Sequence, residues 1–397
     1  MERNKSKKRF YLGIVICIVF VLKVFTITAL AEELKIGAIA TATGPGTQWG
    51  RAVLHGVEMA AEDVNKVGGL KVKGKNYTIK VVNYDDEYTG KGGLSAATRL
   101  IFEDKVKFIV GPIGTAPRMA IKDLIEKNKT VNMMGSYSRK ALDKDTSFAF
   151  RVFVTPEEFA PIFCKWLRQN YPNVKRVAIP APNDETGWET QSEDIAGYEM
   201  NGFEVVFKEF YERGTKDFFP LLTKMMARNP DILELDGNSP GDCGLIVKQA
   251  RQMGFKGMIA KVGGPVTEEL VKIAGKENVE GSIIFVPFDP KDPKIEAFMK
   301  RYEAKYHARM NSFLPSFYDA TKVLFHAIER AGTVDDTEKV VKALEEVDFS
   351  KYKEGLTGPI GWTGKKSYGV NHQAIQKIAV AKIVDGQEVV IATLGEM

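Results

Sequence analysis

Residues 34–69, LKIGAIATATGPGTQWGRAVLHGVEMAAEDVNKVGG, contain the pattern that decides the fold. The apolar run at residues 34–40 predicts a short strand. The apolar side chains of residues 48–67 recur at the spacing of an amphipathic helix, which the glycine pair 68–69 ends. A strand followed at once by such a helix is the repeating unit of a parallel sheet that is covered on both faces. The turn between them, TGPGTQWG at residues 43–50, is as rich in glycine as a phosphate-binding loop.

Strands and helices continue to alternate in two series. The first series predicts strands at residues 77–84, 106–112 and 130–136, and helices at 92–104 and 115–128. The second series begins at Thr155 with a capping box, in which Pro156 follows and Glu158 stands three positions later. The predicted strands of this series are residues 175–180, 203–210, 231–236, 257–262 and 279–289. Three predicted helices follow, at residues 293–309, 316–331 and 336–347. The chain then forms a predicted C-terminal hairpin that turns at Asp385-Gly386. No low-complexity linker separates the series, so we expect two doubly wound α/β lobes with parallel sheets and a hinge between them.

The first 31 residues have the pattern of a secretory signal peptide. MERNKSKKRF is basic, YLGIVICIVFVL is apolar, and ALA at residues 29–31 fits the small-x-small cleavage rule. The uninterrupted apolar run ends at Lys23, short of the roughly 20 residues that a spanning helix needs. We therefore expect cleavage after Ala31 and export to the periplasm.

Charge gives no indication of a nucleic-acid or membrane-surface partner. Residues 1–31 hold six of the 56 basic residues and one of the 51 acidic residues, which leaves 50 of each in the rest of the chain. Two cysteines, Cys164 and Cys243, remain after Ala31, and sequence alone leaves a disulfide between them open. Because Cys164 lies in an apolar helical pattern, we favour two buried thiols.

Two phosphate-binding motifs fail on their spacing. A dinucleotide loop requires a third glycine where Trp49 stands, and GPIGWTGKKS, from Gly358, has five residues between its outer glycines and a second lysine in place of Ser or Thr. GNSPG, at residues 237–241, matches the nucleophile elbow of a serine hydrolase around Ser239. However, Pro240 lacks the backbone N–H that would stabilise the oxyanion, so we interpret this segment as a strand-to-helix turn.

Metal sites and acid–base pairs are also poorly supported. The four histidines are scattered, and the acidic turn at residues 85–87 is better explained as a capping or solvated turn than as a cation site. We expect no catalytic residues, no metal and no cofactor.

Polar and aromatic residues gather after the predicted strands, where open parallel sheets bind ligands. In the first lobe these are Trp49, then Thr115 at the start of a helix after Gly114, then Ser136, Tyr137 and Ser138; the second lobe adds Trp188 and Asp236. Each residue alone is as well explained as a cap or a buried aromatic. Together they predict a cleft with aromatic walls and hydroxyl anchors.

Several segments resemble one family as an ordered set across nearly the whole chain after residue 31. They are TGPGTQWG with GVEMAAEDVNKVGG, VNYDDEYTG, FIVGPIGT, PDILELDG with GLIVKQARQMGFKG, LPSFYDATKVLFHAIERAG and GLTGPIGW. They resemble the leucine/isoleucine/valine-binding proteins of ABC importers, which are type I periplasmic solute receptors. The resemblance implies two Rossmann-like lobes joined by three crossings: residues 32–153 plus 287–368, and residues 154–286 plus 369–397.

The resemblance also implies residue roles. Thr115 and Ser138 match hydroxyl residues that bind the ligand carboxylate, and Ser136 matches the position whose carbonyl accepts from the ligand amine. Trp49 matches an aromatic residue at the mouth of the cleft. The region from Thr186 to Trp188 matches that of an aromatic residue in the second lobe. Two departures stand out. Gly114 occupies one position of the family's first-lobe cysteine pair, and Gly263 and Gly264 stand where amino-acid binders carry an acid for the ligand ammonium. Either Asp236 replaces that acid or the ligand has no α-amino group, because a buried ammonium without a counter-charge is costly.

The implied function is that of an exported, monomeric, non-enzymatic protein. It closes on a small carboxylate-bearing ligand, an amino acid or an aromatic or organic acid, and delivers it to an ABC permease. A ligand-sensing subunit of a signalling receptor is the alternative, and an exported hydrolase using Ser239 is a distant third. Trp49, Tyr137 and Trp188 favour a bulky or aromatic acid.

Overall fold

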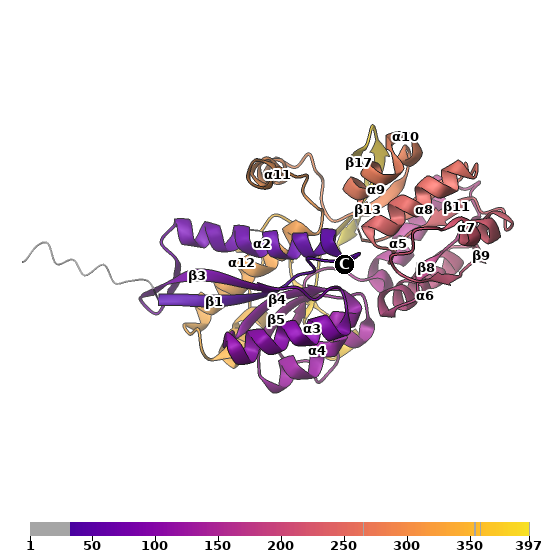
Figure 1. Cartoon of the computed structure of the whole chain (residues 1–397). Coiled ribbons are helices and arrows are strands. Elements are labelled where there is room, and N and C mark those ends of the chain that lie inside the picture. The colour runs from indigo at the N-terminus through magenta and orange to yellow at the C-terminus, as the bar shows by residue number, and fades with distance from the viewer. Residues whose placement is uncertain (1–31, 265, 353–354, 358, 397) are drawn as a thin grey trace, which may run out of the picture. The chain divides into compact units, whose positions relative to one another are not determined.

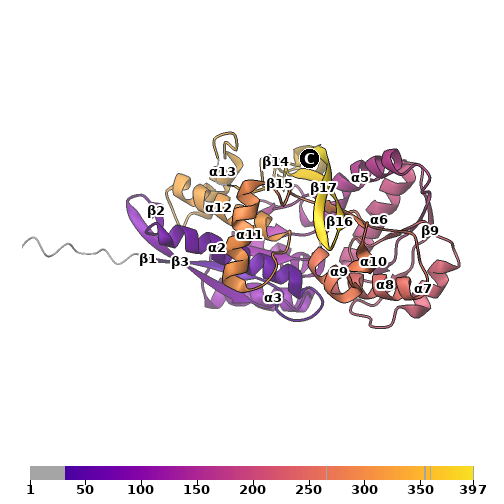
Figure 2. The ribbon, with the colours of Figure 1, turned by 90° about the horizontal axis from the view of Figure 1, so that it is seen from above.

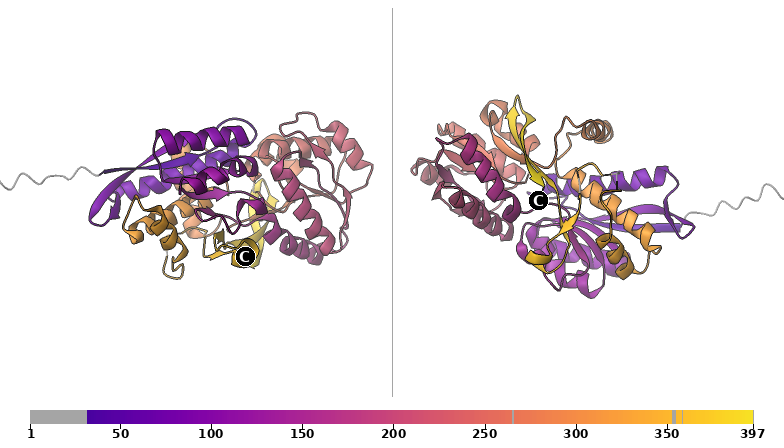
Figure 3. Two further views of the ribbon diagram at one scale, coloured as in Figure 1. Left: turned by 90° about the horizontal axis from the view of Figure 1, so that it is seen from below. Right: turned by 180° about the vertical axis from the view of Figure 1, so that it is seen from behind.

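The computed structural model describes residues 32–264, 266–352, 355–357 and 359–396 (Figure 1). The predicted signal peptide, residues 1–31, therefore lies outside the described residues. Within the described ranges, no helix is both long and apolar enough to cross a bilayer. From Glu33 onward the chain forms two α/β lobes, each built around its own sheet (Figures 1 and 3).

The first lobe is built on an eight-stranded sheet with the order β14-β15-β6-β5-β4-β1-β3-β2. Its strands are β1 (Glu32–Ile39), β2 (Leu70–Val72), β3 (Lys75–Tyr84), β4 (Phe108–Ile113), β5 (Val131–Gly135), β6 (Ala149–Arg151), β14 (Trp362–Thr363) and β15 (Gln373–Ala374). The central strands β1, β4, β5 and β6 pair in parallel, while β2 and β14 pair antiparallel at the two edges. Helices α2 (Thr47–Lys66) and α12 (Leu314–Ala331) cover one face, and α3 (Gly90–Thr98) and α4 (Thr115–Lys127) cover the other (Figure 1).

The second lobe is built on a seven-stranded sheet with the order β17-β16-β13-β12-β11-β7-β9. Its strands are β7 (Arg176–Ala178), β9 (Glu204–Phe207), β11 (Ile232–Glu234), β12 (Met258–Lys261), β13 (Ile283–Val286), β16 (Lys377–Val384) and β17 (Gln387–Glu396), with β8 (Ala181–Pro182) and β10 (Phe210–Tyr211) as a separate pair. Helices α5 (Pro156–Asn170) and α6 (Glu185–Met200) pack together, as do α8 (Pro240–Gln252) and α9 (Thr267–Ala274). Helices α7 (Phe219–Met226) and α10 (Lys276–Val279) also belong to this lobe, whereas α11 (Pro293–Tyr306), α13 (Thr337–Glu345) and α14 (Lys365–Tyr368) belong to the first.

The chain passes between the two sheets three times, after β6, after β13 and after β15. This confirms the predicted α/β class with mostly parallel sheets and a hinge of three crossings. The last crossing lies nearer the C-terminus than the expected boundary at residue 368, because Gln373 of β15 still pairs with Arg151 of the first sheet. The chain then ends in the β16–β17 hairpin at the edge of the second sheet (Figure 2, yellow).

Local signals in the sequence explain several of these elements. Thr155 caps α5 as predicted, and its N–H donates to Glu158 Oε2 at 2.7 Å. The predicted hairpin turn is also confirmed, with Asp385 and Gly386 both at positive φ, as a two-residue turn between twisted strands requires. The predicted helix at 92–104 is instead α3 followed by a π-helical turn at Arg99–Glu103.

Apolar side chains fill the space between each sheet and its helices. Ile36, Val110 and Phe317 are fully buried in the first lobe, and Phe163 and Val177 in the second. Cys164 and Cys243 are both buried and free, so the structure contains the two thiols that we favoured and no bridge between them.

Candidate functional site

Seven of the nine predicted ligand residues line one cavity of about 20 Å³ between the two lobes. Trp49, Gly114, Thr115, Ser136 and Tyr137 come from the first lobe, and Thr186 and Asp236 come from the second. Each follows the carboxyl end of a strand, as the sheet-end rule predicted. A cavity of this size holds about one water molecule, so a larger ligand requires the lobes to separate and close again around it.

The first-lobe wall offers hydrogen-bond donors at the start of α4. The N–H of Thr115 donates to Thr186 Oγ1 at 3.4 Å, and Ser136 Oγ donates to Thr115 Oγ1 at 3.4 Å. These hydrogen bonds are long, and both Thr115 and Ser136 are 1% exposed. A carboxylate at this helix N-terminus would give the same donors shorter, charge-assisted hydrogen bonds.

Aromatic side chains form the apolar part of the wall. The rings of Trp49 and Tyr88 lie 5.6 Å apart between centroids, and Tyr137 packs edge-on against Phe153 at 5.6 Å. Neither Trp49 Nε1 nor Tyr137 Oη has a hydrogen-bond partner among the described residues, although both atoms are buried. Two polar atoms at the cavity therefore remain available to a ligand.

Glycines in and near the turn at residues 43–50 leave space for an aromatic side chain of the cavity wall. A Cβ atom at Gly46 would lie 2.4 Å from Tyr88 Cδ2, and one at Gly114 would lie 2.7 Å from Tyr88 Cε2. Gly114 also has φ +128°, which other residues rarely adopt. The turn TGPGTQWG thus allows Tyr88 to pack close to the backbone beside Trp49.

Asp236 gives the second-lobe wall a carboxyl group. It is 1% exposed, and neither oxygen has a hydrogen-bond partner among the described residues. Lys261 Nζ lies 3.7 Å from Asp236 Oδ1 and donates to Leu235 O at 2.8 Å. Burial raises the pKa of Asp236, while the Lys261 ammonium acts in the opposite direction.

Two predicted residues do not line the cavity. Ser138 Oγ donates to Glu189 Oε1 of α6 at 2.9 Å and so contacts the other lobe. Trp188 is 48% exposed, and its Nε1 donates to Asn183 Oδ1 at 3.0 Å. Trp188 is two residues after Thr186 on the same helix, a spacing that places the two side chains on different faces. In this structure Trp188 therefore lies outside the cavity.

The cavity also contains residues that sequence reasoning missed. They are Tyr88, Ile113, Phe153, Gly237, Gly264 and Phe313. Tyr88 comes shortly after β3, so the sheet-end rule applied to it as well. Phe313 precedes α12 and is brought to the cavity by tertiary packing, for which the local sequence has no signal.

The competing motifs have structural roles. Ser239 caps α8, where its Oγ accepts from the N–H of Asp242, and it is fully buried. Asp85 accepts from the hydroxyl of Thr43, and Asp86 accepts from the hydroxyl of Thr41 at 2.6 Å. These contacts match the predicted turn and capping roles. Across the described part of the chain, no group of three or more His, Cys, Asp or Glu side chains is arranged to hold a metal ion.

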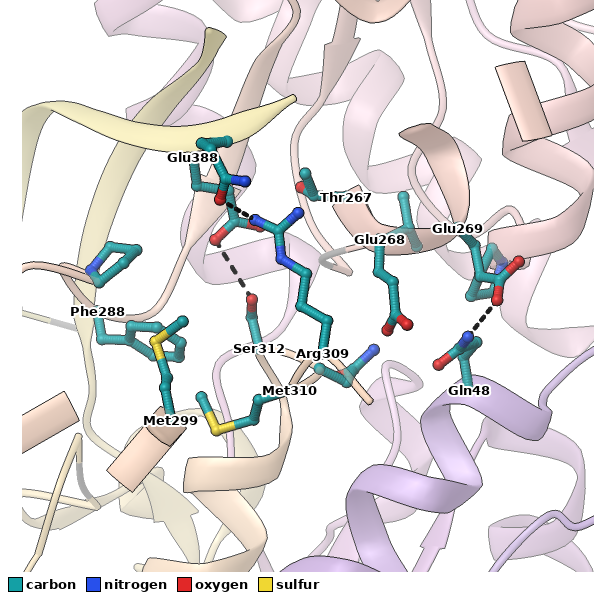
Figure 4. Close-up of a pocket in the computed structure, with 15 residues that line it drawn as sticks. Gln48, Thr267, Glu268, Glu269, Phe288, Met299, Arg309, Met310, Ser312 and Glu388 are labelled. Carbon is teal, nitrogen blue, oxygen red and sulfur yellow. Dashed lines mark hydrogen bonds between the residues drawn. The ribbon is translucent and has the colours of Figure 1, made fainter. Parts of the chain in front are cut away.

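A second cavity, of about 50 Å³, lies beside the hinge (Figure 4). Gln48 of α2 donates to Glu269 of α9 at one side of it, and Ser312 Oγ donates to Glu388 Oε2 at 3.5 Å on the other. Gln48 and Glu269 belong to different lobes, as do Ser312 and Glu388, so both of these hydrogen bonds join the lobes. None of the predicted ligand residues lines it.

Sequence comparison places the chain among solute receptors. The family model described as Periplasmic binding protein matches residues 33–388. A leucine-, isoleucine-, valine-, threonine- and alanine-binding protein from Pseudomonas aeruginosa is 28% identical over 338 residues, which is 84% of this chain and 87% of that protein. The Leu/Ile/Val-binding protein of Escherichia coli is 24% identical over 343 residues, 86% and 89% of the two chains.

Solved structures share the two-lobed architecture. A leucine-binding protein from Thermotoga maritima superposes with a TM-score of 0.78 at 26% identity, over 91% of this chain and 99% of its own. An ABC-transporter solute-binding protein from R. palustris in complex with benzoate has the same fold, with a TM-score of 0.77 at 18% identity over 92% and 97% of the chains. The match over residues 33–388 covers both lobes, and the chain belongs to the periplasmic binding protein family.

Proposed function

We propose that this protein captures a small carboxylate-bearing molecule, an amino acid or an aromatic or organic acid, between its lobes and delivers it to an ABC permease. The observation that carries the proposal is the arrangement of Thr115 and Ser136. Their hydroxyls and the N–H of Thr115 meet at the start of α4, buried in the cavity that both lobes enclose. Helix N-termini stabilise anions through free N–H groups and the helix dipole.

The relatives support the carboxylate class. One is described as binding leucine, isoleucine, valine, threonine and alanine, and another was solved with benzoate. These ligands differ in size and in their amine, but all carry a carboxylate. The aromatic wall of Trp49, Tyr88 and Phe153 would contact the remainder of the ligand.

The three crossings support a hinge mechanism. Among the described residues, only the segments after β6, β13 and β15 join the two sheets, so the lobes can separate by changes at a few backbone positions. Separation would admit the ligand, and closure would bring Thr186 and Asp236 against it.

The proposal includes export, with the mature chain beginning at Glu32, and no catalytic role. The buried capping position of Ser239 speaks against the hydrolase alternative. A receptor that senses the same ligand for a signalling system would use the same cavity. Delivery is therefore tested separately, by uptake of labelled ligand in cells with and without the gene.

A thermal-shift screen tests the ligand class. The protein is purified after export, its N-terminus is determined, and it is mixed with the twenty amino acids, aromatic acids and short aliphatic acids. A ligand that binds the folded state raises the melting temperature by mass action, by an amount set by its concentration relative to Kd. We expect shifts from carboxylates and none from the corresponding amides, which lack the anion. Shifts from neutral sugars or bases alone would overturn the proposal.

A further inference from the structure

A cluster of buried charged groups lies directly behind the second-lobe wall of the cavity. It consists of Asp194 on α6, Glu234 and Asp236 at the end of β11, and Lys261 on β12. None of the four is more than 1% exposed. Three carboxyl groups therefore share one lysine ammonium in the interior of the lobe, where an unbalanced charge is costly.

Glu234 has the contacts of an ionised carboxylate. Its Oε1 accepts from the N–H groups of Leu235, Asp236 and Val262, each at 2.9 Å. Its Oε2 accepts from the hydroxyl of Tyr198 at 2.6 Å. Burial raises the pKa of Glu234, but these four donors favour its charged form, and Asp194 and Asp236 have fewer donors.

In the described part of the chain, Asp194 has no such support, and Asp236 has only the ammonium of Lys261, whose Nζ lies 3.7 Å from its Oδ1. Neither oxygen of either carboxyl has a hydrogen-bond partner within the described ranges. Burial raises the pKa of Asp194 well above its usual range and also raises that of Asp236. Because three carboxyls share one ammonium, the cluster is electrically neutral only while two of them hold a proton, and Asp194 and Asp236, which have fewer donors than Glu234, are the groups that we assign these protons to.

Gly264 opens this cluster to the cavity. A Cβ atom at Gly264 would lie 3.4 Å from Asp236 Oδ1, 3.4 Å from Lys261 Nζ and 3.5 Å from Tyr137 Oη. Because no Cβ is present, a ligand group in the cavity can reach Asp236 and the unpartnered hydroxyl of Tyr137. This opening lies on the lobe that does not carry Thr115 and Ser136.

We propose that Asp236, with Asp194 behind it, forms a proton-exchange subsite that selects for a ligand carrying an amine. The ligand ammonium takes the place of the proton on Asp236 and pairs with the carboxylate that remains, and the released proton passes to solvent. The buried cluster is neutral before and after this exchange. The inference rests on the proposed function, because the ligand carboxylate must first be held at Thr115.

Other titratable groups around the cluster do not exchange protons near neutral pH. Tyr198 on α6 and Cys164 on α5 are buried, and burial raises the pKa of each well above its usual range. Burial likewise raises the pKa of Tyr137 from the first lobe, and that of Cys243 on α8 to about 12.

The nearby cation Arg213 is already neutralised. It donates to both carboxylate oxygens of Asp184 and to Gly237 O at 3.1 Å. Asp242 accepts from the hydroxyl of Tyr211 at 3.2 Å and from the N–H of Gly214 at 3.3 Å, which support its carboxylate. Burial still raises the pKa of Asp242, but Asp242 does not line the cavity, whereas Asp236 does.

Titration calorimetry in two buffers with different ionisation enthalpies measures this exchange. The probes are the amino acid that gives the largest thermal shift among the twenty and the same molecule without its amine, for example leucine and 4-methylpentanoate. We expect about one proton released per amino acid bound and about none for the deaminated acid. The Kd of the amino acid should fall as pH rises towards the raised pKa of the Asp236 carboxyl, by up to about tenfold per pH unit, while that of the deaminated acid stays constant.

Variants separate the subsite from a general effect on folding. Asp236→Asn should abolish proton release and weaken amino-acid binding at least tenfold more than it weakens binding of the deaminated acid. Asp194→Asn should reduce the pH dependence. Glu199→Gln, which removes an exposed carboxylate from the same helix, should change neither. If Asp236→Asn does not fold, as judged by circular dichroism, Asp194→Asn and the wild-type proton count decide the question.

The outcomes distinguish this inference from the function on which it rests. Amino-acid binding without proton release, or with a pH-independent Kd, overturns the exchange. Carboxylates that bind while no amino acid does also overturn it, but leave the proposed function intact. If no carboxylate binds at all, both proposals fail.

Discussion

Ser138 Oγ in the first lobe donates a 2.9 Å hydrogen bond to Glu189 Oε1 in the second. Ser138 follows β5, and Glu189 lies on the first turns of α6, one residue after the exposed Trp188. Further polar contacts join the lobes outside the cavity, among them those between Gln48 and Glu269 and between Arg139 and Glu157. The closed arrangement of the lobes is therefore stabilised by side chains that need not touch a ligand.

A double-mutant cycle on Ser138 and Glu189 tests this role. Ser138→Ala should weaken ligand binding about 2- to 10-fold, because closure loses a net hydrogen bond worth about 0.5–1.5 kcal/mol. Glu189→Gln should have a similar or smaller effect, and the double variant should be no worse than Ser138→Ala. Ser147→Ala, at an exposed serine of the same lobe, is the control. Additive losses in calorimetric Kd would mean instead that Ser138 contacts the ligand, as the family resemblance implied.

Thr115 should contribute more to binding than Ser138. Thr115→Ala removes a hydroxyl that would donate to an anion, and we expect calorimetric affinity for the best carboxylate to fall about 5- to 100-fold, or about 1–3 kcal/mol. Thr115→Ser keeps the hydroxyl and should recover most of the affinity. Thr223→Ala, on an exposed helix position of the other lobe, controls for general destabilisation. Unchanged affinity in Thr115→Ala would remove this residue from the site.

Trp188 should be dispensable for binding, although its sequence position drew attention to it. Its ring is 48% exposed and lies outside the cavity, whereas Trp49 is 4% exposed and lines it. We expect Trp188→Ala to leave Kd within about twofold and Trp49→Ala to weaken binding at least tenfold, because a buried aromatic loses most of its contact area. A large loss in Trp188→Ala alone would show that α6 turns this side chain inward when the ligand binds.

Residues that follow strands with a clear apolar pattern in the sequence were predictable, because one rule places all of them at the same edge of a sheet. Thr115, Ser136 and Asp236 were found in this way and do line the cavity. Phe153 was missed because β6, which precedes it, is only three residues long and has no alternation of its own. Its pairing with β5 and β15 depends on contacts distant in sequence.

Helical geometry accounts for a different kind of error. Thr186 and Trp188 lie two positions apart on α6, and such positions point about 200° apart around the helix axis. The sequence indicated that this turn reaches the cleft, but not which of its faces does. Lys261 was overlooked for another reason: a lysine in an apolar strand is normally expected to reach solvent, and here Asp236 and Leu235 hold it in the interior.

Asp86 should make stability fall as pH rises from about 4 to about 6. Burial raises its pKa to about 6, and Oδ2 of this carboxyl has no hydrogen-bond partner among the described residues. The folded state thus binds a proton that the unfolded chain, with a pKa near 4, has already lost. The associated stabilisation is complete below about pH 4 and is lost as pH passes about 6. A difference of about two pKa units corresponds to about 3 kcal/mol.

Denaturant unfolding of the wild type and Asp86→Asn at pH 4 and pH 7 measures this contribution. The amide cannot titrate, and its oxygen still accepts from the hydroxyl of Thr41 and the N–H of Tyr88, as Asp86 Oδ1 does now. Between the two pH values, the wild type should therefore lose about 2–3 kcal/mol relative to the variant. Asp335→Asn changes a carboxylate that is 81% exposed, so its free energy of unfolding should change with pH as that of the wild type does. If the free energy of unfolding of Asp86→Asn also changes with pH as that of the wild type does, the buried carboxyl titrates at its ordinary pKa. The polar turn beside Tyr88 would then be open to water.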